Sequence, residues 1–287
     1  MSKALQIYYN AIFGAIGGLL GWLTVGSVDT GSWSIWLAYP FVGAGVGLCI
    51  GGMTGAVEGI VIKQSIPRAL LGMALGAMAG LVSGLLGLLL GEVGFLILGG
   101  GLIGRMLGWM LLGLLLGVGE GIVSRSQKRA SYGAVGGAIA GAVGGFVYEA
   151  MTQAFLQQSD RVQMIVGAFG LLLIGACLGA IIPLTIIGLA RGSLYIRSGK
   201  RQGLEVAVVD AVTIGSYDGC ELYLPGDPQI EKKHARVYRK EGRFFLEDLN
   251  SRQGTFLNGA RVAPGVATVV APGAKIRLGG TEIELRG

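Results

Sequence analysis

The chain contains few residues that could hold a metal ion or act as a catalytic base. His234 is the only histidine, and the three cysteines, Cys49, Cys177 and Cys220, share no motif spacing with it or with one another. Structural zinc sites need cysteines and histidines at short regular spacings, so the sequence predicts no metal site. We interpret the cysteines as small buried hydrophobic residues.

Residues for nucleophilic catalysis or nucleotide hydrolysis are also missing from the sequence. Ser251 and Thr255 have no accompanying histidine and aspartate in an arrangement that would activate a hydroxyl group. The glycine-rich runs are not followed by the Gly-Lys-Ser/Thr triplet of a phosphate-binding loop. The sequence therefore predicts neither an enzyme nor a bound cofactor, and it indicates a binding protein instead.

The composition separates the chain into two unlike parts. Of the 287 residues, 52% are hydrophobic, 14% are charged and 54 are glycine, unlike an ordinary soluble domain. Residues 1–202 hold 12 Lys or Arg and 6 Asp or Glu, whereas residues 203–287 hold 11 of each, so the net charge of +6 belongs to the first part. Because this positive charge accompanies apolar segments, it indicates a membrane surface and not nucleic acid.

The first part contains apolar stretches long enough to cross a bilayer, which takes about 20 helical residues. We predict a six-helix transmembrane domain over residues 1–192. A cleaved signal peptide is the alternative for the first stretch, but Phe13–Gly18 resembles Tyr132–Gly137, which favours a retained helix. The stretches lie near residues 8–25, 40–62, 69–91, 94–123, 131–149 and 163–190.

Internal similarity predicts three copies of a helical hairpin in this domain. Gly55–Val61 matches Gly117–Val123 at a spacing of 62 residues. Glycine at every fourth residue falls on one helix face, where the missing side chain lets two backbones approach. The interpretation is a tightly packed glycine-zipper bundle, and the alternative is a pore or transport path lined by glycine. The packing glycines are Gly72, Gly76, Gly80, Gly84, Gly133, Gly137, Gly141 and Gly145.

Loop charges predict the orientation of the helices. Basic residues gather in the loops on the side shared by Lys3 and residues 191–201. By the positive-inside rule, both termini are expected in the cytoplasm. A bacterial inner membrane is the expected location, because the sequence shows no eukaryotic targeting signal. The opposite loops carry Asp29, Glu92, Glu149, Asp160 and Arg161.

Three charged residues lie within the predicted spans. Arg105 is expected a third to half of the way along the fourth span, either as a substrate or ion site or as an arginine paired within the bundle. Glu58 and Glu120 occupy equivalent repeat positions near the basic loops, so we expect them to pair with Lys63 or Arg125.

Beyond Arg201 the pattern changes to short β-branched runs separated by turn residues, which is typical of an all-β sandwich. We expect a basic linker over residues 193–202 and the sandwich over residues 203–287. The order of the motifs in this region resembles that of forkhead-associated (FHA) domains, which implies an eleven-stranded sandwich that binds phosphothreonine peptides through loops at one end. The motifs are Val212–Gly215, Leu222–Pro225, Ile230–Ala235, Phe245–Leu249, Ser251–Gly259 and Ile276–Gly279.

The resemblance also implies roles for single residues. His234 is expected to brace the binding loop from inside. Ser216 stands where FHA domains usually carry arginine, and Glu231 replaces a serine that would face the phosphate. A carboxylate repels phosphate, whereas nearby basic residues attract it, so binding of a phosphothreonine peptide and binding of an unphosphorylated protein both stay open. The structural positions are Gly215, His234, Gly254, Thr255, Asn258 and Gly259, and the ligand-binding positions are Ser216, Glu231, Lys232, Lys233, Arg252 and Gln253.

These features together predict a cytoplasmic protein-recognition module anchored in the lipid bilayer. It would bind a protein partner in signalling or in assembly of a membrane complex, and it could also form a homo-oligomer. The alternative is a small channel or transporter regulated by its FHA domain. A cavity lined by Arg105 would favour this alternative.

Overall fold

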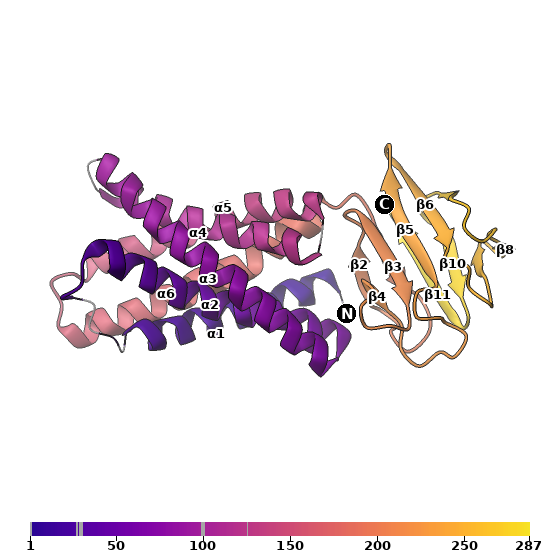
Figure 1. Cartoon of the computed structure of the whole chain (residues 1–287), viewed down its shortest axis with the longest axis horizontal. Coiled ribbons are helices and arrows are strands. Elements are labelled where there is room, and N and C mark those ends of the chain that lie inside the picture. Colours follow the sequence, from indigo (N-terminus) through magenta and orange to yellow (C-terminus); the bar gives the residue numbers. More distant parts are fainter. Residues whose placement is uncertain (1, 27, 29–30, 99–100, 125) are drawn as a thin grey trace. The chain divides into compact units, whose positions relative to one another are not determined.

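The computed structural model describes the whole chain except residues 1, 27, 29–30, 99–100 and 125, so Asp29 and Arg125 lie outside the described residues. The chain divides into two compact units. One unit, Gln6–Ile186, is helical, and the other, formed mainly by Ile187–Gly287, is built of β-strands (Figure 1).

Six long helices are found among the described residues, as the sequence predicts (Figure 1). All six are long and apolar enough to cross a membrane, by length and composition. A π-helical segment, Glu58–Lys63, continues the second helix, and Gln64 ends it in the left-handed conformation with φ 52°. The helices are α1 (Lys3–Gly26), α2 (Ile35–Val57), α3 (Ile66–Ile97), α4 (Gly101–Ser124), α5 (Gln127–Ala154) and α6 (Asp160–Leu189).

In three pairs of helices, a glycine of one helix faces the carbonyl oxygen of a glycine of the other. The pairs are α2 with α3, α4 with α5, and α6 with α1. A Cβ atom added to a glycine in these contacts would collide with a backbone carbonyl of the facing helix, so a larger residue would force the helices apart. The facing glycines are Gly43 with Gly84, Gly47 with Gly80, Gly51 with Gly76, Gly55 with Gly72, Gly113 with Gly137, Gly117 with Gly133, and Gly175 with Gly14.

These contacts follow the spacing of 62 residues that the sequence contains. Gly51, Gly113 and Gly175 are separated by that spacing, and each one faces a glycine of another helix. Each of these three pairs joins the second helix of one hairpin (α1–α2, α3–α4 or α5–α6) to the first helix of the next, whereas Gly91 and Gly108 meet within one hairpin. The last helix, α6, contacts α1 in the same way, so the three pairs close into a ring.

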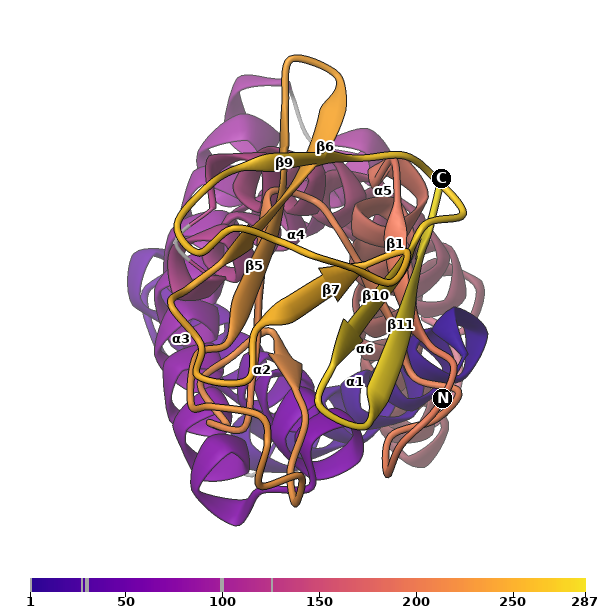
Figure 2. The same ribbon diagram turned by 90° about the vertical axis from the view of Figure 1, so that its right-hand side faces the viewer.

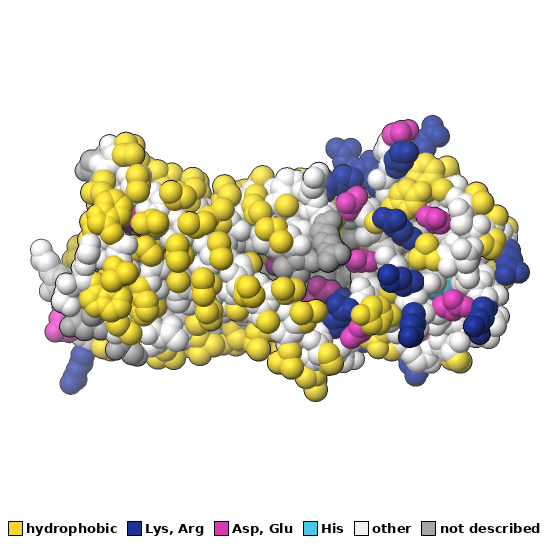
Figure 3. Space-filling view, in the orientation of Figure 1, with side chains coloured by type: hydrophobic (Ala, Val, Ile, Leu, Met, Phe, Trp, Pro, Cys, Tyr) yellow, Lys and Arg dark blue, Asp and Glu magenta, His cyan; other side chains and the backbone are white. Residues whose placement is uncertain are grey.

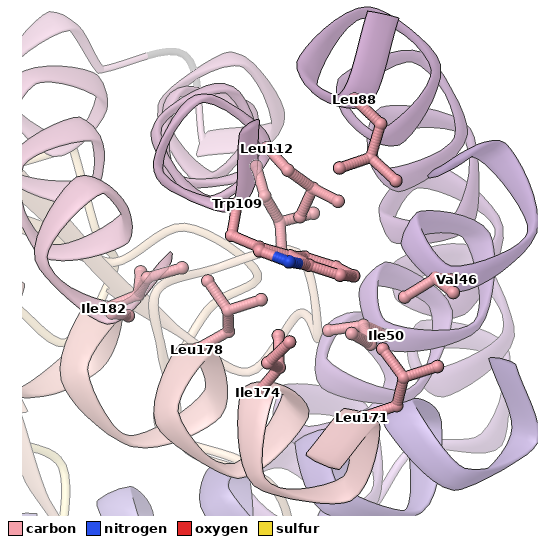
Figure 4. Close-up of a cluster of buried hydrophobic side chains, with 11 residues drawn as sticks. Val46, Ile50, Leu88, Trp109, Leu112, Leu171, Ile174, Leu178 and Ile182 are labelled. Atoms are coloured by element: carbon pink, nitrogen blue, oxygen red, sulfur yellow. The ribbon is translucent and has the colours of Figure 1, made fainter. Parts of the chain in front are cut away.

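Large apolar side chains fill the space between the helix pairs. Figure 4 shows the indole of Trp109, from α4, surrounded by apolar side chains of α2, α4 and α6. Ile50, Leu112 and Ile174 are fully buried in this cluster, and Trp109 is 6% exposed. Gly141 lies against the backbone carbonyl of Trp109 and Gly145 against its side chain, so Gly145 leaves the space that the indole requires.

The outward faces of the helices are apolar. Exposed side chains include Ile97, Ile122 and Met78, of which 78%, 71% and 69% are accessible. From Ser193 onward, the exposed large hydrophobic side chains are only Tyr217, Val266 and Val269. Figure 3 shows the same contrast on one face, with hydrophobic side chains over the helices and charged ones over the strands. Such an extended apolar surface is unlike that of a soluble domain.

The structure moves five charged residues from their predicted places, and two of them, Asp160 and Arg161, were expected in a loop but begin α6. Arg105 lies in the second turn of α4 and not further along, because this helix begins only at Gly101. Glu92 and Glu149, which were expected in loops, lie inside α3 and α5, because both helices continue past the apolar stretches.

Glu58 and Glu120, the two other charges predicted within the membrane, lie at or near the C-terminal ends of α2 and α4. Glu58 Oε1 is 2.9 Å from Lys63 Nζ, one of the two pairings that the sequence suggests. Glu120 is exposed on α4, close to the end of that helix. Arg125, its other suggested partner, lies outside the described residues.

The second unit is a sandwich of two sheets, and Figure 2 shows β5 and β6 on one side and β10 and β11 on the other. One sheet has the order β2-β1-β11-β10-β7-β8, and the other has the order β4-β3-β5-β6-β9. The strands are β1 (Ser193–Ile196), β2 (Glu205–Ala207), β3 (Ala211–Gly215), β4 (Leu222–Tyr223), β5 (Ala235–Lys240), β6 (Arg243–Asp248), β7 (Thr255–Leu257), β8 (Ala260–Arg261), β9 (Thr268–Val270), β10 (Lys275–Leu278) and β11 (Thr281–Arg286).

The sandwich begins earlier than predicted. Residues 193–202 were expected to form a linker, but β1 lies within them and pairs with both β2 and β11. Leu194 and Ile196 are fully buried and alternate along β1 with Ser193 and Tyr195, which is the pattern of a strand with one face in the core. The basic residues that suggested a linker lie only in the turn that follows.

Candidate functional site

Three loops of the sandwich lie together at one end of its five-stranded sheet. The pairing of Ile214 with Ala235 and of Ala235 with Asp248 places the end of β3, the start of β5 and the end of β6 side by side. The loops at this end are 216–221, 224–234 and 249–254. They carry all the predicted ligand-binding residues: Ser216, Glu231, Lys232, Lys233, Arg252 and Gln253.

His234 is fully buried and connects two of these loops. Its Nδ1 accepts a hydrogen bond of 3.2 Å from the backbone N–H of Glu231, and its Nε2 lies 3.3 Å from the carbonyl oxygen of Gly254. Since an accepting Nδ1 leaves the proton on Nε2, these bonds assign a neutral imidazole that donates to Gly254. The side chain thus fixes the spacing between loops 224–234 and 249–254.

Asp248, which the sequence analysis did not select, organises loop 249–254. Its carboxylate accepts hydrogen bonds from Ser251 Oγ at 2.6 Å, from Ser251 N at 3.0 Å and from Thr255 Oγ1 at 2.5 Å. Burial raises the pKa of Asp248, but the hydrogen bonds from Ser251 and Thr255 outweigh it and hold the pKa below its usual range. An aspartate that ends a strand three residues before a serine is the sequence signal for such a turn.

Gly215 allows the backbone of loop 224–234 to lie directly against β3. A Cβ atom at this position would collide with the carbonyl oxygen of Lys232. Beside it, the backbone N–H of Ser216 donates to the carbonyl oxygen of Glu231 at 2.9 Å. Ser216, Glu231 and Lys232 are therefore held next to one another by the main chain.

The carboxylate of Glu231 reaches from one loop to the next. Glu231 Oε1 accepts a hydrogen bond of 3.0 Å from the backbone N–H of Arg252, and Arg252 Nε lies 3.8 Å from the same oxygen. The Arg252 side chain is 93% exposed, so this ion pair contributes little, whereas the backbone hydrogen bond holds the carboxylate in place. The carboxylate of Glu231 thus occupies the backbone N–H of Arg252, a hydrogen-bond donor that an incoming anion could otherwise use.

Basic side chains follow Glu231 in the sequence and lie near Gly254. Lys232 and Lys233, the next two residues, are exposed, and Arg261, which was not among the predicted residues, adds an exposed guanidinium. A Cβ atom at Gly254 would lie 2.5 Å from Arg261 Nε, so this guanidinium covers Gly254. The sequence signal for the place of Arg261 is the Asn258-Gly259 turn.

Asn258 and Gly259 form the turn that brings β8 back along β7. Their φ angles are 50° and 89°, the positive values that a tight two-residue hairpin requires. Asn258 Oδ1 also accepts the backbone N–H of Lys275 at 2.9 Å, which fixes the turn against β10. Arg261 is thereby paired with Phe256 and returned to the candidate site.

The family model of the FHA domain matches residues 212–279. This part of the chain is an FHA domain. The chain is 34% identical over 94 residues to FHA domain-containing protein FhaB of Mycolicibacterium smegmatis and 33% identical over 94 residues to FhaB of Mycobacterium tuberculosis. Each match covers 32% of this chain and 59% of the relative, so the chain spans less than two thirds of the curated relatives it matches.

Solved structures of FHA domains match about a third of the chain. One comes from a structural and functional analysis of phosphothreonine-dependent FHA domain interactions, with 28% identity, a TM-score of 0.29 and coverage of 33% of this chain and 95% of that one. Another is the FhaA FHA domain complexed with the intracellular domain of Rv3910, also with 28% identity and a TM-score of 0.29, covering 33% of this chain and 99% of that one.

Proposed function

We propose that this chain is a membrane-anchored recognition protein whose FHA domain binds a cytoplasmic protein partner in signalling or in assembly of a membrane complex. The observation that carries the proposal is the FHA domain itself, at residues 212–279 of a chain whose helices have apolar outward faces. FHA domains are phosphopeptide-binding modules without catalytic groups, so recognition is the role that this domain supplies.

The helical unit supports the membrane part of the proposal. Its six helices have the length and composition to span a bilayer, and lipid would cover side chains such as Met78 and Ile122 that water would not solvate well. Backbone contacts through small residues are a typical means of helix association in lipid. The basic loops favour cytoplasmic termini, which would place the FHA domain among cytoplasmic proteins.

The candidate partner is a protein segment with an acidic or phosphorylated side chain. Lys232, Lys233, Arg252 and Arg261 supply positive charge around the loops, whereas the carboxylate of Glu231 occupies the backbone N–H of Arg252. A phosphate could take the N–H of Arg252 only if Glu231 released it, and repulsion between the two anions would oppose close approach. Glu231 is therefore proposed to weaken phosphate binding without preventing recognition of other partners.

Binding of the full chain in detergent to a library of threonine peptides, each phosphorylated and unmodified, tests this function. The proposal expects binding of selected peptides that is lost when both Lys232 and Arg252 are replaced by alanine. Purification of partners from cell extract, with and without phosphatase treatment, then shows whether phosphate contributes. Absence of any peptide or protein bound through these loops would contradict the proposal.

A small channel or transporter is a second candidate, favoured by one specific observation. The helical unit contains a cavity of about 520 Å³ that Arg105 lines. A site inside a helix bundle that carries charge is a typical location for a transported solute. Flux of solutes into liposomes that contain the purified chain would test this candidate.

A further inference from the structure

The cavity beside Arg105 lies at the end of the helical unit where α2 and α4 begin and α3 and α5 end. Residues from all four helices line it, together with Gly31 and Trp33 from the segment before α2. Its volume of about 520 Å³ is that of a site for a small organic molecule. Trp109 forms part of its wall and also belongs to the apolar core, so one side of the cavity is closed by packed core side chains.

Arg105 is already satisfied by groups of the protein. Its Nη1 lies 2.9 Å from Glu92 Oε2, and only 6% of the Glu92 side chain is exposed. Its guanidinium also covers two aromatic rings, 4.2 Å from the centre of Phe95 and 4.8 Å from the centre of Tyr39. A ligand anion would have to compete with Glu92 for this guanidinium, so Arg105 is a poor anion site.

Glu149 is the second carboxylate of the cavity and has a different environment. The positive charge of Arg105 acts on it without forming a salt bridge among the described residues, and the indole of Trp109 donates a hydrogen bond to it. Of the described lining residues, Glu92 and Glu149 are acidic and Arg105 is basic, which leaves one negative charge in excess. The electrostatic balance of the cavity therefore favours a cation.

Aromatic rings form much of the remaining wall. Trp33, Tyr39, Trp109 and Tyr148 all line the cavity, and Trp109 and Tyr148 meet edge to face with ring centres 5.4 Å apart. Ring faces attract cations, and cages of aromatic residues bind quaternary ammonium groups. A metal ion is a poor fit, because the described residues contain no cluster of three or more His, Cys, Asp or Glu side chains.

We propose that this cavity binds a small organic ammonium ion, with Glu149 as its counter-charge and the aromatic rings as its walls. Neither the FHA domain nor its proposed partner requires such a site. In the proposed topology the cavity opens at the external end of the helices, so the ligand would be a free solute or an ammonium headgroup of a lipid.

Titration calorimetry on the full chain in a maltoside detergent tests the site. The probes are choline, tetraethylammonium, benzyltrimethylammonium and dimethylbutanol, the neutral isostere in which carbon replaces the nitrogen of choline. At least one ammonium probe should bind, and choline should bind more tightly than dimethylbutanol. Binding of none of the ammonium probes, or equal binding of choline and dimethylbutanol, overturns the proposal.

Two variants and their matched controls separate a site from a general effect on folding. Glu149→Gln keeps an acceptor for Trp109 but removes the charge, so it should weaken ammonium binding by about tenfold or more. Glu58→Gln, which neutralises a carboxylate that does not line the cavity, should leave it unchanged. Trp33→Leu should weaken binding by roughly threefold or more, whereas Trp36→Leu, outside the cavity, should not.

Unchanged binding in both Glu149→Gln and Trp33→Leu, with melting temperatures near that of the wild type, overturns the proposal. Nanodiscs identify the source of the ligand. If a lipid headgroup fills the cavity, choline will bind in phosphatidylglycerol discs but not in phosphatidylcholine discs. If the ligand is a free solute, choline will bind equally in both, and either result supports the site.

Discussion

The Glu231 carboxylate and the backbone N–H of Arg252 are joined by a hydrogen bond of 3.0 Å between two loops of the FHA domain. The bond holds a negative charge of the protein in the same loops as Lys232, Lys233 and Arg252. Its removal should therefore change how the domain discriminates between phosphorylated and unmodified peptides.

Replacing Glu231 by serine should strengthen phosphothreonine binding, because it removes the repulsion and frees the N–H of Arg252. Adding Ser216→Arg should strengthen it further by supplying a bidentate donor. Charge-assisted hydrogen bonds contribute roughly 1.5–3 kcal/mol, so each change should alter the affinity by about tenfold. Peptide titration by fluorescence anisotropy measures the effect, with Glu247→Ser as a control. Tight phosphothreonine binding by the wild type would contradict our account of Glu231.

Any preference of the wild type for phosphorylated peptides should depend on the exposed basic residues. Replacing Lys232 and Arg252 together by alanine should abolish that preference, because Ser216 cannot replace a guanidinium. The matched control replaces Lys240 and Arg243, at the other end of β5 and β6, and should have no effect. A preference that survives in the first double variant would show that Arg261 or another group binds the phosphate.

The hydrogen bonds of Asp248 should stabilise loop 249–254. Asp248→Asn cannot accept both Ser251 bonds and the Thr255 bond in the present geometry, so local opening should become easier by about 1–3 kcal/mol. Hydrogen exchange of the loop amides in the full chain measures this. Exchange as slow as in the wild type would contradict the role of Asp248.

The lowered pKa of Asp248 predicts that the stability of loop 249–254 depends on pH. The folded pKa of Asp248 lies below its unfolded value, so the stabilisation is complete above the unfolded pKa of about 3.9 and is lost as the pH falls through the folded pKa. Loop protection in the wild type should therefore fall in acid. The Asp248→Asn variant should lack this component of the pH dependence.

Glycines at the helix contacts should not tolerate large side chains. Gly76→Leu and Gly137→Leu place four carbons where a Cβ atom already collides with a carbonyl of the facing helix, and each should destabilise the helical unit by about 1–3 kcal/mol or more. Gly94→Leu is the control, because no atom lies within 4 Å of a Cβ at that position. Thermal melting in detergent compares the three, and equal melting temperatures would contradict the packing argument.

Both termini should lie in the cytoplasm, because the loops rich in lysine and arginine share one side with Lys3 and Arg201. Reporter fusions after Gln202 and after Ser32 should report opposite sides of the membrane. An external signal from the fusion after Gln202 would reverse the topology and remove the FHA domain from cytoplasmic partners.

The order of the elements could be predicted from the sequence because each leaves a local pattern. Apolar stretches of about 20 residues marked the six helices, and the spaced motifs marked the sandwich. Helix ends could not be placed well, since Glu92 and Glu149 interrupt the apolar pattern while the helices continue. Strand β1 was missed because only four residues carry its alternation and basic residues follow them.

The site was predictable to the extent that the resemblance to FHA domains covered it. That resemblance selected the loops and His234, but Asp248 and Arg261 act through contacts that depend on turns between strands. The cavity in the helical unit could not be predicted, because residues such as Trp33, Arg105 and Glu149 are far apart in the sequence. Their proximity follows from the packing of four helices.

The contact of α6 with α1 has a consequence for biosynthesis. Gly14 of the first helix faces Gly175 of the last, so its partner is translated only after nearly the whole helical unit has been made. During insertion, Gly17 and Gly21 of α1 can already contact α2, but Gly14 and Gly18 must wait in lipid or beside the translocation machinery for α6. Ribosome-bound chains that end before α6 should therefore hold α1 through α2 alone, and release of the complete chain should be the step that adds the second contact.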